Sequence, residues 1–433
     1  MTGLKALTPR GRSFLASGVA ALLCALVLGE HDLLRVAVLI IAMPLIASMV
    51  VTRTRYRLAS TRRLGPARVQ AGEESTVTLR LENVTRLPTG LLLVEDTLQY
   101  ALGTRPRFVL DRMESRGVRE IDYKVSSDLR GRFPVGPLSV RIADPFGLVE
   151  LTRSFTVTDT LVVTPEVVPL PPVRLSGEHS GGGDSRTRSV AAAGDDDVAP
   201  REYRQGDDLR RVHWRSTARR GELMVRREEQ ELQSRGALLL DTRRHAHRGE
   251  GPRSSFEVAV SAAASIGVHL SAEGLALRLV TDQGARHVVD GGQSWSLLDT
   301  LAVIRQSTAR SLEHGVAALR QGGGDGLIIA VLGALDLEEA QALAQLRRPG
   351  VTAVAVLLDL ASWDRASGDR ASGDRASGDR ASGNGASWDA VADDGARAAR
   401  SILTGAGWRV LDLPAGASLA GVWPEAGNKR SAA

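Results

Sequence analysis

Three oxygen-bearing side chains stand directly after apolar runs, and they are the best candidates in this sequence for holding a metal ion. Asp241 and Thr242 follow one apolar run, and Asp282 follows the next. Carboxylate and hydroxyl oxygens are the ligands that Mg²⁺ takes in proteins. However, Arg243 comes directly after Thr242, and its charge would repel a cation. Helix capping explains Asp282 equally well, so we expect no bound metal and no other cofactor.

No combination of residues typical of an enzyme is found. The histidines form no HExxH zinc motif, and no serine lies in a GxSxG nucleophile elbow. Cys24 is the only cysteine and lies in an apolar run, which excludes a disulfide framework and a zinc site built from cysteines. The lysines, Lys5, Lys124 and Lys429, lie in no phosphate-binding P-loop. We therefore expect a protein that is not an enzyme.

The densest run of charged residues is the segment 201–231, REYRQGDDLRRVHWRSTARRGELMVRREEQE. Charge runs are usually solvated surfaces. Tyr203 and Trp214 lie among the interleaved charges, however, and aromatic residues beside arginines favour a surface that contacts another domain or a partner. A helix is expected over residues 209–215, and the apolar residues 223–225 predict a short strand.

The pattern RxYxxGDxxRxxxWxxxAR in this segment resembles the signature of the domain of unknown function 58 family. These are bacterial proteins with a von Willebrand factor A-like domain, and the resemblance extends over nearly the whole chain. It implies that the segment either binds a partner or fastens two soluble domains together, with the second slightly favoured. The signature or interaction residues are Arg201, Tyr203, Gly206, Asp207, Arg210, Trp214, Ala218 and Arg219.

The resemblance also implies a metal site from which this sequence departs. Von Willebrand A-like domains hold Mg²⁺ with the motif Asp-x-Ser-x-Ser after their first strand. Arg243 and His245 stand here in place of the two serines, so two hydroxyl ligands are missing. Asp241, Thr242 and Asp282 therefore remain only weak candidates for metal ligands.

Residues 236–424 predict the α/β domain that positions these side chains. Continuous apolar strands, each followed by a helical pattern, predict a doubly wound parallel sheet, in agreement with a von Willebrand A-like fold. The expected strands are 236–241, 275–281, 326–332, 351–358 and 408–413, and the expected helices are 256–270, 297–319, 337–346 and 390–404.

Residues 58–170 predict an antiparallel β-sandwich ahead of the α/β domain. Apolar residues alternate over 76–81, and further short strands follow, separated by Gly, Pro and Asp. The segments 130–138 and 144–148 predict tight turns and resemble motifs that precede the signature in this family. We expect a scaffold or interaction role for the sandwich, with ligand binding in the turns as the alternative.

Residues 1–57 predict a hairpin of two transmembrane helices. The apolar runs Phe14–Gly29 and Val36–Val51 approach the roughly 20 residues that span a bilayer. A signal peptide is the alternative for the first run. By the positive-inside rule the soluble domains face the cytoplasm at the bacterial cell membrane. The basic residues behind this orientation are Lys5, Arg10 and Arg12 before the hairpin and Arg53, Arg55, Arg57, Arg62 and Arg63 after it.

The remaining segments have a biased composition. Residues 171–199 predict a flexible linker, residues 200–235 form the charged signature segment, and the pentapeptide repeats over 361–388 predict a disordered insert. The net charge of +5 and the aromatic content of 4% give no footprint for nucleic acid.

The expected function is that of a membrane-anchored adaptor or scaffold. The resemblance implies work with a MoxR-type AAA+ ATPase, often with a transglutaminase-like membrane protein, in an envelope-linked or chaperone-like process. The alternative is a metal-dependent ligand receptor or a hydrolase that uses the carboxyl edge of the α/β sheet.

Overall fold

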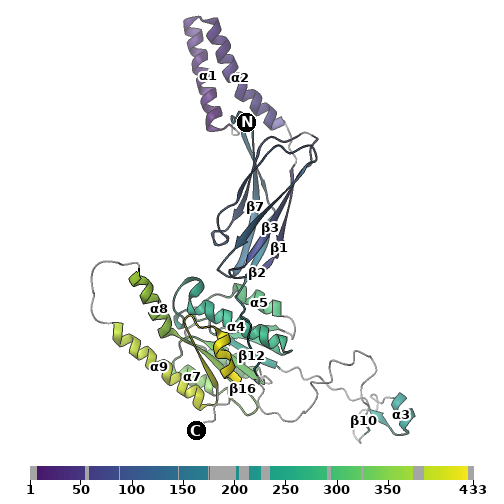
Figure 1. Ribbon diagram of the computed structural model, residues 1–433, viewed down its shortest axis with the longest axis vertical. Coiled ribbons are helices and arrows are strands. Elements are labelled where there is room, and N and C mark those ends of the chain that lie inside the picture. Colours follow the sequence, from purple (N-terminus) through teal and green to yellow (C-terminus); the bar gives the residue numbers. More distant parts are fainter. Residues whose placement is uncertain are drawn as a thin grey trace. The chain divides into compact units, whose positions relative to one another are not determined.

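The chain forms two compact units in the computed structural model (Figure 1). The first unit comprises Met1–Val167, Glu250–Ala264 and Trp295–Arg305, and the second comprises Val168–Gly249, Ser265–Ser294 and Gln306–Ala433. The structure describes residues 7–53, 58–86, 88–144, 146–173, 175, 201–203, 214–225, 235–289, 294–322, 326–373 and 385–427.

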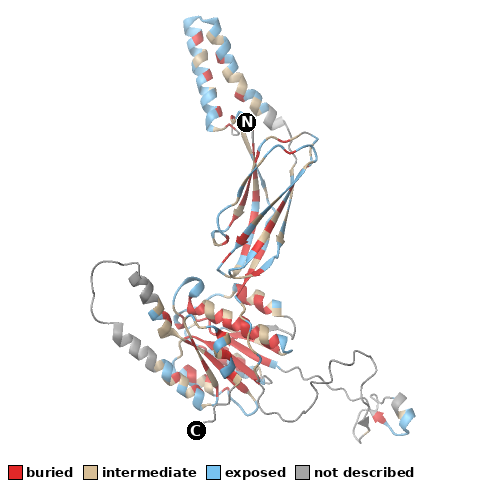
Figure 2. Ribbon diagram, viewed as in Figure 1, coloured by how far each residue is buried: buried red, intermediate tan, exposed pale blue. Residues whose placement is uncertain are grey.

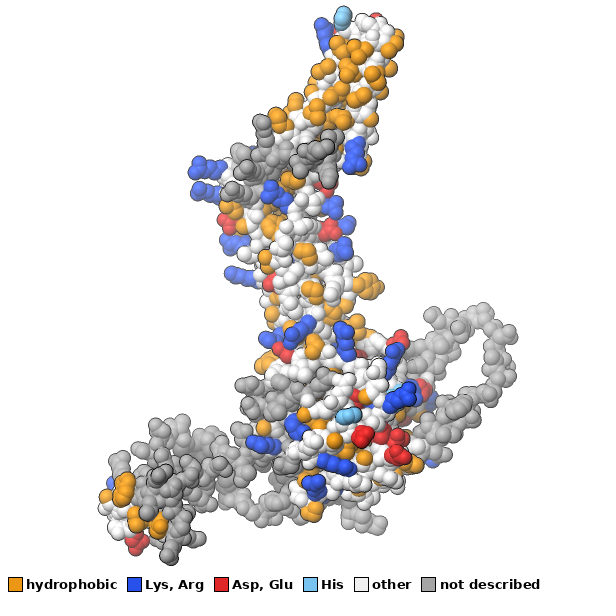
Figure 3. Space-filling model, turned by 180° about the vertical axis from the view of Figure 1, so that it is seen from behind, with side chains coloured by type: hydrophobic (Ala, Val, Ile, Leu, Met, Phe, Trp, Pro, Cys, Tyr) orange, Lys and Arg blue, Asp and Glu red, His pale blue; other side chains and the backbone are white. Residues whose placement is uncertain are grey.

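Two apolar helices open the first unit, as the sequence predicts. Helices α1 (Pro9–Leu28) and α2 (His31–Arg53) are long and apolar enough to cross a membrane, and only 17% of each apolar window is buried within the protein. Figure 3 shows the apolar surface of this hairpin. Helix α4 (Ser255–Ala272) meets the same criterion of length and composition, but 67% of it is buried, so it is a core helix. The orientation of the hairpin stays a prediction.

The β-sandwich consists of two sheets with one shared core. One sheet has the order β1-β3-β6, and the other has the order β2-β9-β7-β4-β5, with β8 also pairing with β7. Val77, Leu79 and Leu81 alternate along β3 and face the core, as the sequence pattern predicts. Figure 2 shows buried and exposed residues alternating along the strands of the sandwich. The strands are β1 (Leu58–Gly65), β2 (Arg68–Gln70), β3 (Glu74–Asn83), β4 (Leu92–Leu98), β5 (Arg107–Leu110), β6 (Val118–Ser126), β7 (Gly131–Ala143), β8 (Glu150–Phe155) and β9 (Asp159–Thr164).

Of the two predicted turns, one is confirmed and one is wrong. In the turn 144–148, the backbone N–H of Gly147 donates to the carbonyl of Asp144 at 3.0 Å, and Gly147 has a φ of 66°. Residues 131–138 instead lie within the long strand β7. Gly136 is needed there for close packing, because a Cβ at this position would lie 2.8 Å from the guanidinium of Arg62.

Arg62 is buried in the sandwich. The prediction of membrane orientation counted it among the exposed basic residues that follow the hairpin. Its side chain is 4% exposed and pairs with the fully buried Asp96 at 2.7 Å. Tyr123 donates its hydroxyl to the other oxygen of Asp96 at 2.6 Å. A guanidinium that leaves water needs such a partner, so Arg62 belongs to the sandwich interior.

The second unit is built on a six-stranded sheet of order β14-β13-β12-β15-β16-β17. All neighbours are parallel except β14, an antiparallel edge strand that the sequence analysis missed. A core packs one face of the sheet against α6 (Glu313–Gln321), α7 (Leu337–Ala344) and α9 (Gly385–Gly405). The strands are β12 (Arg235–Leu240), β13 (Ala276–Thr281), β14 (Gly284–Val289), β15 (Leu327–Leu332), β16 (Thr352–Asp359) and β17 (Arg409–Pro414).

One predicted helix is divided in the structure, and the predicted insert is helical where the structure describes it. The expected helix 297–319 is divided into α5 (Ser294–Val303) and α6, because the backbone of Ser307 between them bonds to Thr242 and Arg244. The predicted disordered insert 361–388 is helical at both ends, in α8 (Leu360–Gly373) and the start of α9. Trp363 is buried and fixes the start of α8, and alanine favours the helix. Residues 374–384 lie outside the described residues.

The close packing of α1 on α2 depends on Gly18, where a Cβ would lie 2.7 Å from Ile41. We expect Gly18→Leu to separate the helices, at a cost of about 1–3 kcal/mol, because overpacking forces the backbones apart. Hydrogen exchange of the α1 and α2 amides in detergent micelles should become faster. Ala20→Leu on the exposed face of α1 is the control; equal exchange in both variants would contradict this packing.

Candidate functional site

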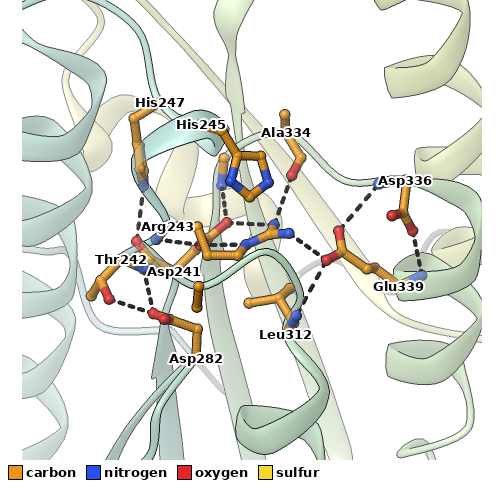
Figure 4. Close-up of polar contacts among 12 residues, drawn as sticks. Asp241, Thr242, Arg243, His245, His247, Asp282, Leu312, Ala334, Asp336 and Glu339 are labelled. Carbon is orange, nitrogen blue, oxygen red and sulfur yellow. Dashed lines mark hydrogen bonds and ion pairs between the residues drawn. The ribbon is translucent and has the colours of Figure 1, made fainter. Parts of the chain in front are cut away.

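The best candidate site lies at the carboxyl end of β12. The sheet extends from this strand in both directions, to β13 on one side and to β15 on the other. In open α/β sheets, ligands bind outside the carboxyl ends of the strands at such a reversal of strand order. Asp241 follows β12 here, and Asp282 follows β13, so the structure brings together the predicted residues Asp241, Thr242 and Asp282 (Figure 4).

The guanidinium of Arg243 fills this position. Its Nε and Nη2 atoms each donate to one carboxylate oxygen of Asp241 at 2.9 Å, and Nη2 also donates to the carbonyl of Ala334 at 2.8 Å. Nη1 donates to Glu339. The side chain of Arg243 is only 1% exposed. Burial opposes its charge, but the hydrogen bonds and charges of Asp241 and Glu339 outweigh burial and raise the pKa of Arg243.

Glu339 connects this arginine to helix α7. Its carboxylate accepts from the backbone N–H of Leu312 at 3.2 Å and from that of Asp336, also at 3.2 Å. The side chain of Asp336 in turn accepts from the backbone N–H of Glu339 at 2.7 Å, which completes a capping box at the start of α7. The start of α7 is therefore held by the same carboxylate that pairs with Arg243.

Asp282 is satisfied by a second set of protein groups. One of its oxygens accepts from the backbone N–H of Thr242 at 3.0 Å and from the Thr242 hydroxyl. The other accepts from the hydroxyl of Ser307. All three residues are buried. Asp282 thus holds the loop after β12 against the segment between α5 and α6.

These residues do not fit the Mg²⁺ ion that the von Willebrand A-like resemblance implies. One carboxylate oxygen of Asp241 accepts from the backbone N–H and the Nε of Arg243. The other oxygen accepts from the Nη2 of Arg243 and from the backbone N–H of Gly333. Its lone pairs are therefore in use, and a cation would have to displace a buried guanidinium. Within the described ranges, no group of three or more His, Cys, Asp or Glu residues is arranged to hold a metal.

The two histidines of this loop have different surroundings. His245 is exposed, whereas His247 is buried and its Nε2 lies 2.9 Å from the backbone oxygen of Asp241. Burial lowers the pKa of His247, although the charge of Asp241 acts in the opposite direction. His247 is thus held as a neutral imidazole that supports the loop.

A second buried arginine, Arg130, lies in one of the sandwich segments that resemble family motifs. Within the first unit it donates to Glu257 and to the carbonyls of Leu301 at 3.0 Å and Ile304 at 2.6 Å. Its guanidinium also lies 5.1 Å from the ring centre of Phe256. Burial lowers the pKa of Arg130 to about 10, so it remains charged at neutral pH. This segment therefore carries a structural contact, and a ligand in this place would have to replace those partners.

The signature segment forms a small element of its own in the parts that the structure describes. Strand β10 (Arg201–Glu202) pairs with β11 (Met224–Val225), and the N–H of Tyr203 donates to the carbonyl of Leu223 at 2.8 Å. The strand predicted over 223–225 is therefore confirmed. Gly206, Asp207 and Arg210 lie outside the described residues.

Helix α3 (Trp214–Arg220) carries the rest of the described signature. It lies later in the chain than the helix expected over 209–215, of which residues 209–213 are outside the described residues. Trp214 is 72% exposed, and Ala218 and Arg219 are exposed too. The N–H of Met224 donates to the hydroxyl of Thr217 at 3.0 Å, which ties α3 to β11.

Sequence reasoning missed several residues of these networks. Glu339 has a recognisable signal, since Asp336 and Glu339 have the spacing of a capping box. Arg130 has only its place in a family-like motif. Ser307 and Glu257 have no local signal, because their roles depend on partners that are distant in the sequence.

Comparisons with known proteins match part of this chain to a family of unknown function. Residues 199–307 match the family described as "Protein of unknown function DUF58". The chain is 25% identical over 214 residues to "Uncharacterized protein YeaD" of Bacillus subtilis (strain 168), covering 48% of this chain and 51% of that protein. The chain thus spans about half the length of this relative.

Solved structures offer weaker similarities. The CARDB domain of the PF1109 protein from Pyrococcus furiosus aligns with 25% of this chain and 93% of its own, at 11% identity and a TM-score of 0.19. The alkylpurine DNA glycosylase AlkC from Pseudomonas fluorescens aligns with 31% of this chain and 40% of its own, at 13% identity and a TM-score of 0.18. Similarities at this level carry no conclusion about fold or function.

Removal of the buried guanidinium should destabilise the protein strongly. We expect Arg243→Ala to lower the free energy of unfolding by about 3–5 kcal/mol, because Asp241 and Glu339 would remain buried without their cation. Thermal unfolding followed by circular dichroism measures this change. Arg244→Ala is the matched control, since its neighbouring side chain is exposed. Equal melting temperatures for the two variants would contradict the role assigned to Arg243.

His247 should make stability sensitive to acid. Its pKa is lowered in the folded state, so below its ordinary value of about 6.5 the unfolded chain binds a proton that the folded chain does not. Stability is therefore full above that value and falls as the pH drops towards the folded pKa. We expect a smaller acid-induced fall in melting temperature for His247→Gln than for the wild type. The control His245→Gln should show the same acid-induced fall in melting temperature as the wild type. An equal fall in the two variants would refute the role of His247.

Proposed function

We infer the function from the premise that this chain belongs to the DUF58 family. Residues 199–307 match the model of that family. We propose that it is a membrane-anchored adaptor or scaffold without catalytic activity that acts with a MoxR-type AAA+ ATPase. The process is envelope-linked or chaperone-like, and a transglutaminase-like membrane protein is a further partner. The protein resides in the bacterial cell membrane with its soluble domains in the cytoplasm.

The observation that carries this proposal is the exposed signature element. Trp214 is 72% exposed on a short helix that also presents Arg219. Tryptophan and arginine contribute most of the binding energy at many protein interfaces, and an exposed tryptophan has a hydration cost that a partner removes. The exposure of both side chains within this element supports a surface that contacts a partner.

The sheet of the second unit supports a von Willebrand A-like fold as part of the proposal. Its strand order has parallel strands on both sides of β12 and one antiparallel strand, β14, at an edge, which supports a doubly wound sheet. The carboxyl edge of such a sheet is the usual place for a ligand. Here Arg243 is buried in that place, which disfavours a metal-dependent receptor or hydrolase.

The apolar hairpin supports the location. Both helices expose large apolar side chains along their length, among them Leu23, Val27 and Leu39. Arg10 and Arg12 lie in the first turn of α1, and Arg53 ends α2, so both ends of the hairpin are basic. Basic residues at both ends favour the cytoplasmic side for the soluble mass.

The test is an affinity capture with the full-length chain in nanodiscs, using a purified MoxR-type ATPase with ATP or ADP. We expect nucleotide-dependent binding that Trp214→Ala with Arg219→Ala weakens by about 2 kcal/mol or more, roughly 30-fold, as for interface hot spots. Trp295→Ala is the control, because this tryptophan is also exposed, at 63%, but lies outside the signature.

Two results would contradict the proposal. The first is the absence of ATPase binding in both nucleotide states. The second is equal loss of binding in the signature variant and in Trp295→Ala, which would remove the signature element from the interface. Melting temperatures of the variants must match the wild type, because a large fall for the signature variant would instead indicate that these residues fasten the fold together.

A further inference from the structure

The turn between β7 and β8 presents an aromatic side chain on a fixed backbone. Phe146 is 61% exposed. The carboxylate of Asp144 accepts from the backbone N–H of Phe146 at 3.0 Å and from that of Val149 at 2.6 Å. Gly147 closes the turn with its N–H on the carbonyl of Asp144. The backbone of Phe146 is therefore bonded to Asp144, while its side chain is exposed and does not pack into the sandwich.

The same turn is fastened to the start of helix α1. The hydroxyl of Thr8, the N-cap of α1, donates to the carbonyl of Gly147 at 2.7 Å, and the N–H of Thr8 donates to that of Leu148 at 3.0 Å. A Cβ on Gly11 would lie 2.2 Å from the carbonyl oxygen of Leu148. The first turn of α1 thus rests directly on the backbone beside Phe146.

Apolar packing joins helix α2 to this contact. Leu7, Leu148 and Val149 form a buried cluster, and Met43 and Ala47 of α2 pack against it. The base of the apolar hairpin and the β7–β8 turn are therefore one continuous structure within the first unit. Whatever surrounds the base of the hairpin also surrounds this turn.

The depth of the turn follows from helix geometry. The apolar run begins at Phe14, five residues after the start of α1 at Pro9, which is about 7.5 Å along a helix that rises about 1.5 Å per residue. The headgroup layer on each side of a bilayer is about 5–7 Å thick. The turn is consequently level with the headgroups when α1 spans the hydrocarbon. Arg10 is exposed there, and a Cβ on Gly147 would lie 3.8 Å from its Nη1.

We propose that Phe146 inserts into the boundary between headgroups and acyl chains, and that with Arg10 it seats the β-sandwich on the lipid surface. The inference rests on the proposed membrane anchoring of α1 and α2. Aromatic side chains are favoured at this depth, and arginine binds the phosphates of anionic lipids. The β7–β8 turn thus acts as a second, interfacial contact beside the transmembrane helices.

Site-directed spin labelling of the full-length chain in vesicles of phosphatidylcholine and phosphatidylglycerol tests the proposal. The chain has a single cysteine, Cys24, within α1, so a nitroxide on the natural residue reports whether the hairpin spans the bilayer. The variant Cys24→Ser with Phe146→Cys moves the label to the turn, where the apolar nitroxide stands in for the phenyl ring.

Cys24→Ser with Tyr100→Cys is the matched control. Tyr100 is also an exposed aromatic residue, at 98%. It follows strand β4, at the end of the β4–β7 ladder where Leu98 pairs with Val135. The β7–β8 turn lies at the other end of that ladder, after Ile142. The two labels thus probe opposite ends of the same sandwich.

The readout is a ratio of two collision rates for each label. The first is the rate with oxygen, which concentrates in lipid, and the second is the rate with a nickel complex that stays in water. We expect a high ratio at residue 24 and a ratio at residue 146 several-fold above that at residue 100. A ratio at 146 equal to that at 100, with residue 24 still deep, would overturn the interfacial contact and leave the anchor standing. A water-exposed label at residue 24 would overturn the anchor and the contact together.

Discussion

A guanidinium that is buried must be paired, and this requirement recurs in both units of the described structure. Arg62 inside the sandwich, Arg130 before β7 and Arg243 after β12 are each at most 6% exposed in their side chains, and each meets a carboxylate. Stripping water from such a charge costs several kcal/mol, so the pair is tolerated only in the arrangement where the donors find acceptors. Apolar packing restricts the arrangement of strands and helices through shape, and a buried charge adds the requirement that specific donors meet specific acceptors. We infer that the paired arginines select one arrangement among those that apolar packing alone would permit.

The parts of the fold that could be predicted are those with a local cause. The alternation of Val77, Leu79 and Leu81 is a property of neighbouring residues, and so are the apolar runs that became β12, β15 and β16. The two apolar helices follow from composition in the same way. The break between α5 and α6 could not be predicted, because a helical pattern continues through it. Ser307 leaves the helix because its backbone bonds to the loop after β12, which is distant in sequence.

The candidate site shows the same division between local and distant causes. Asp241, Thr242 and Asp282 could be placed at one edge, because parallel strands bring their carboxyl ends together. The effect of Arg243 was predicted only as repulsion of a cation. The structure adds that its guanidinium donates to both oxygens of Asp241 and to Glu339, a residue nearly a hundred positions away. A buried ion pair of this kind has no signature in the sequence, since each partner alone resembles an ordinary surface charge.

The buried guanidinium at the carboxyl end of β12 bears on how this sheet edge can bind a ligand. A bound metal keeps open positions that a partner's carboxylate can fill, whereas the donors of Arg243 point at Asp241, Glu339 and Ala334 and leave the side chain 1% exposed. A metal bridge at this edge would have to displace the buried guanidinium, whereas surface side chains elsewhere stay accessible. The exposed Trp214 and Arg219 provide such groups within the region that matches the family. The buried ion pairs of Arg243 with Asp241 and Glu339 hold the loop after β12 to helix α7 through protein groups alone.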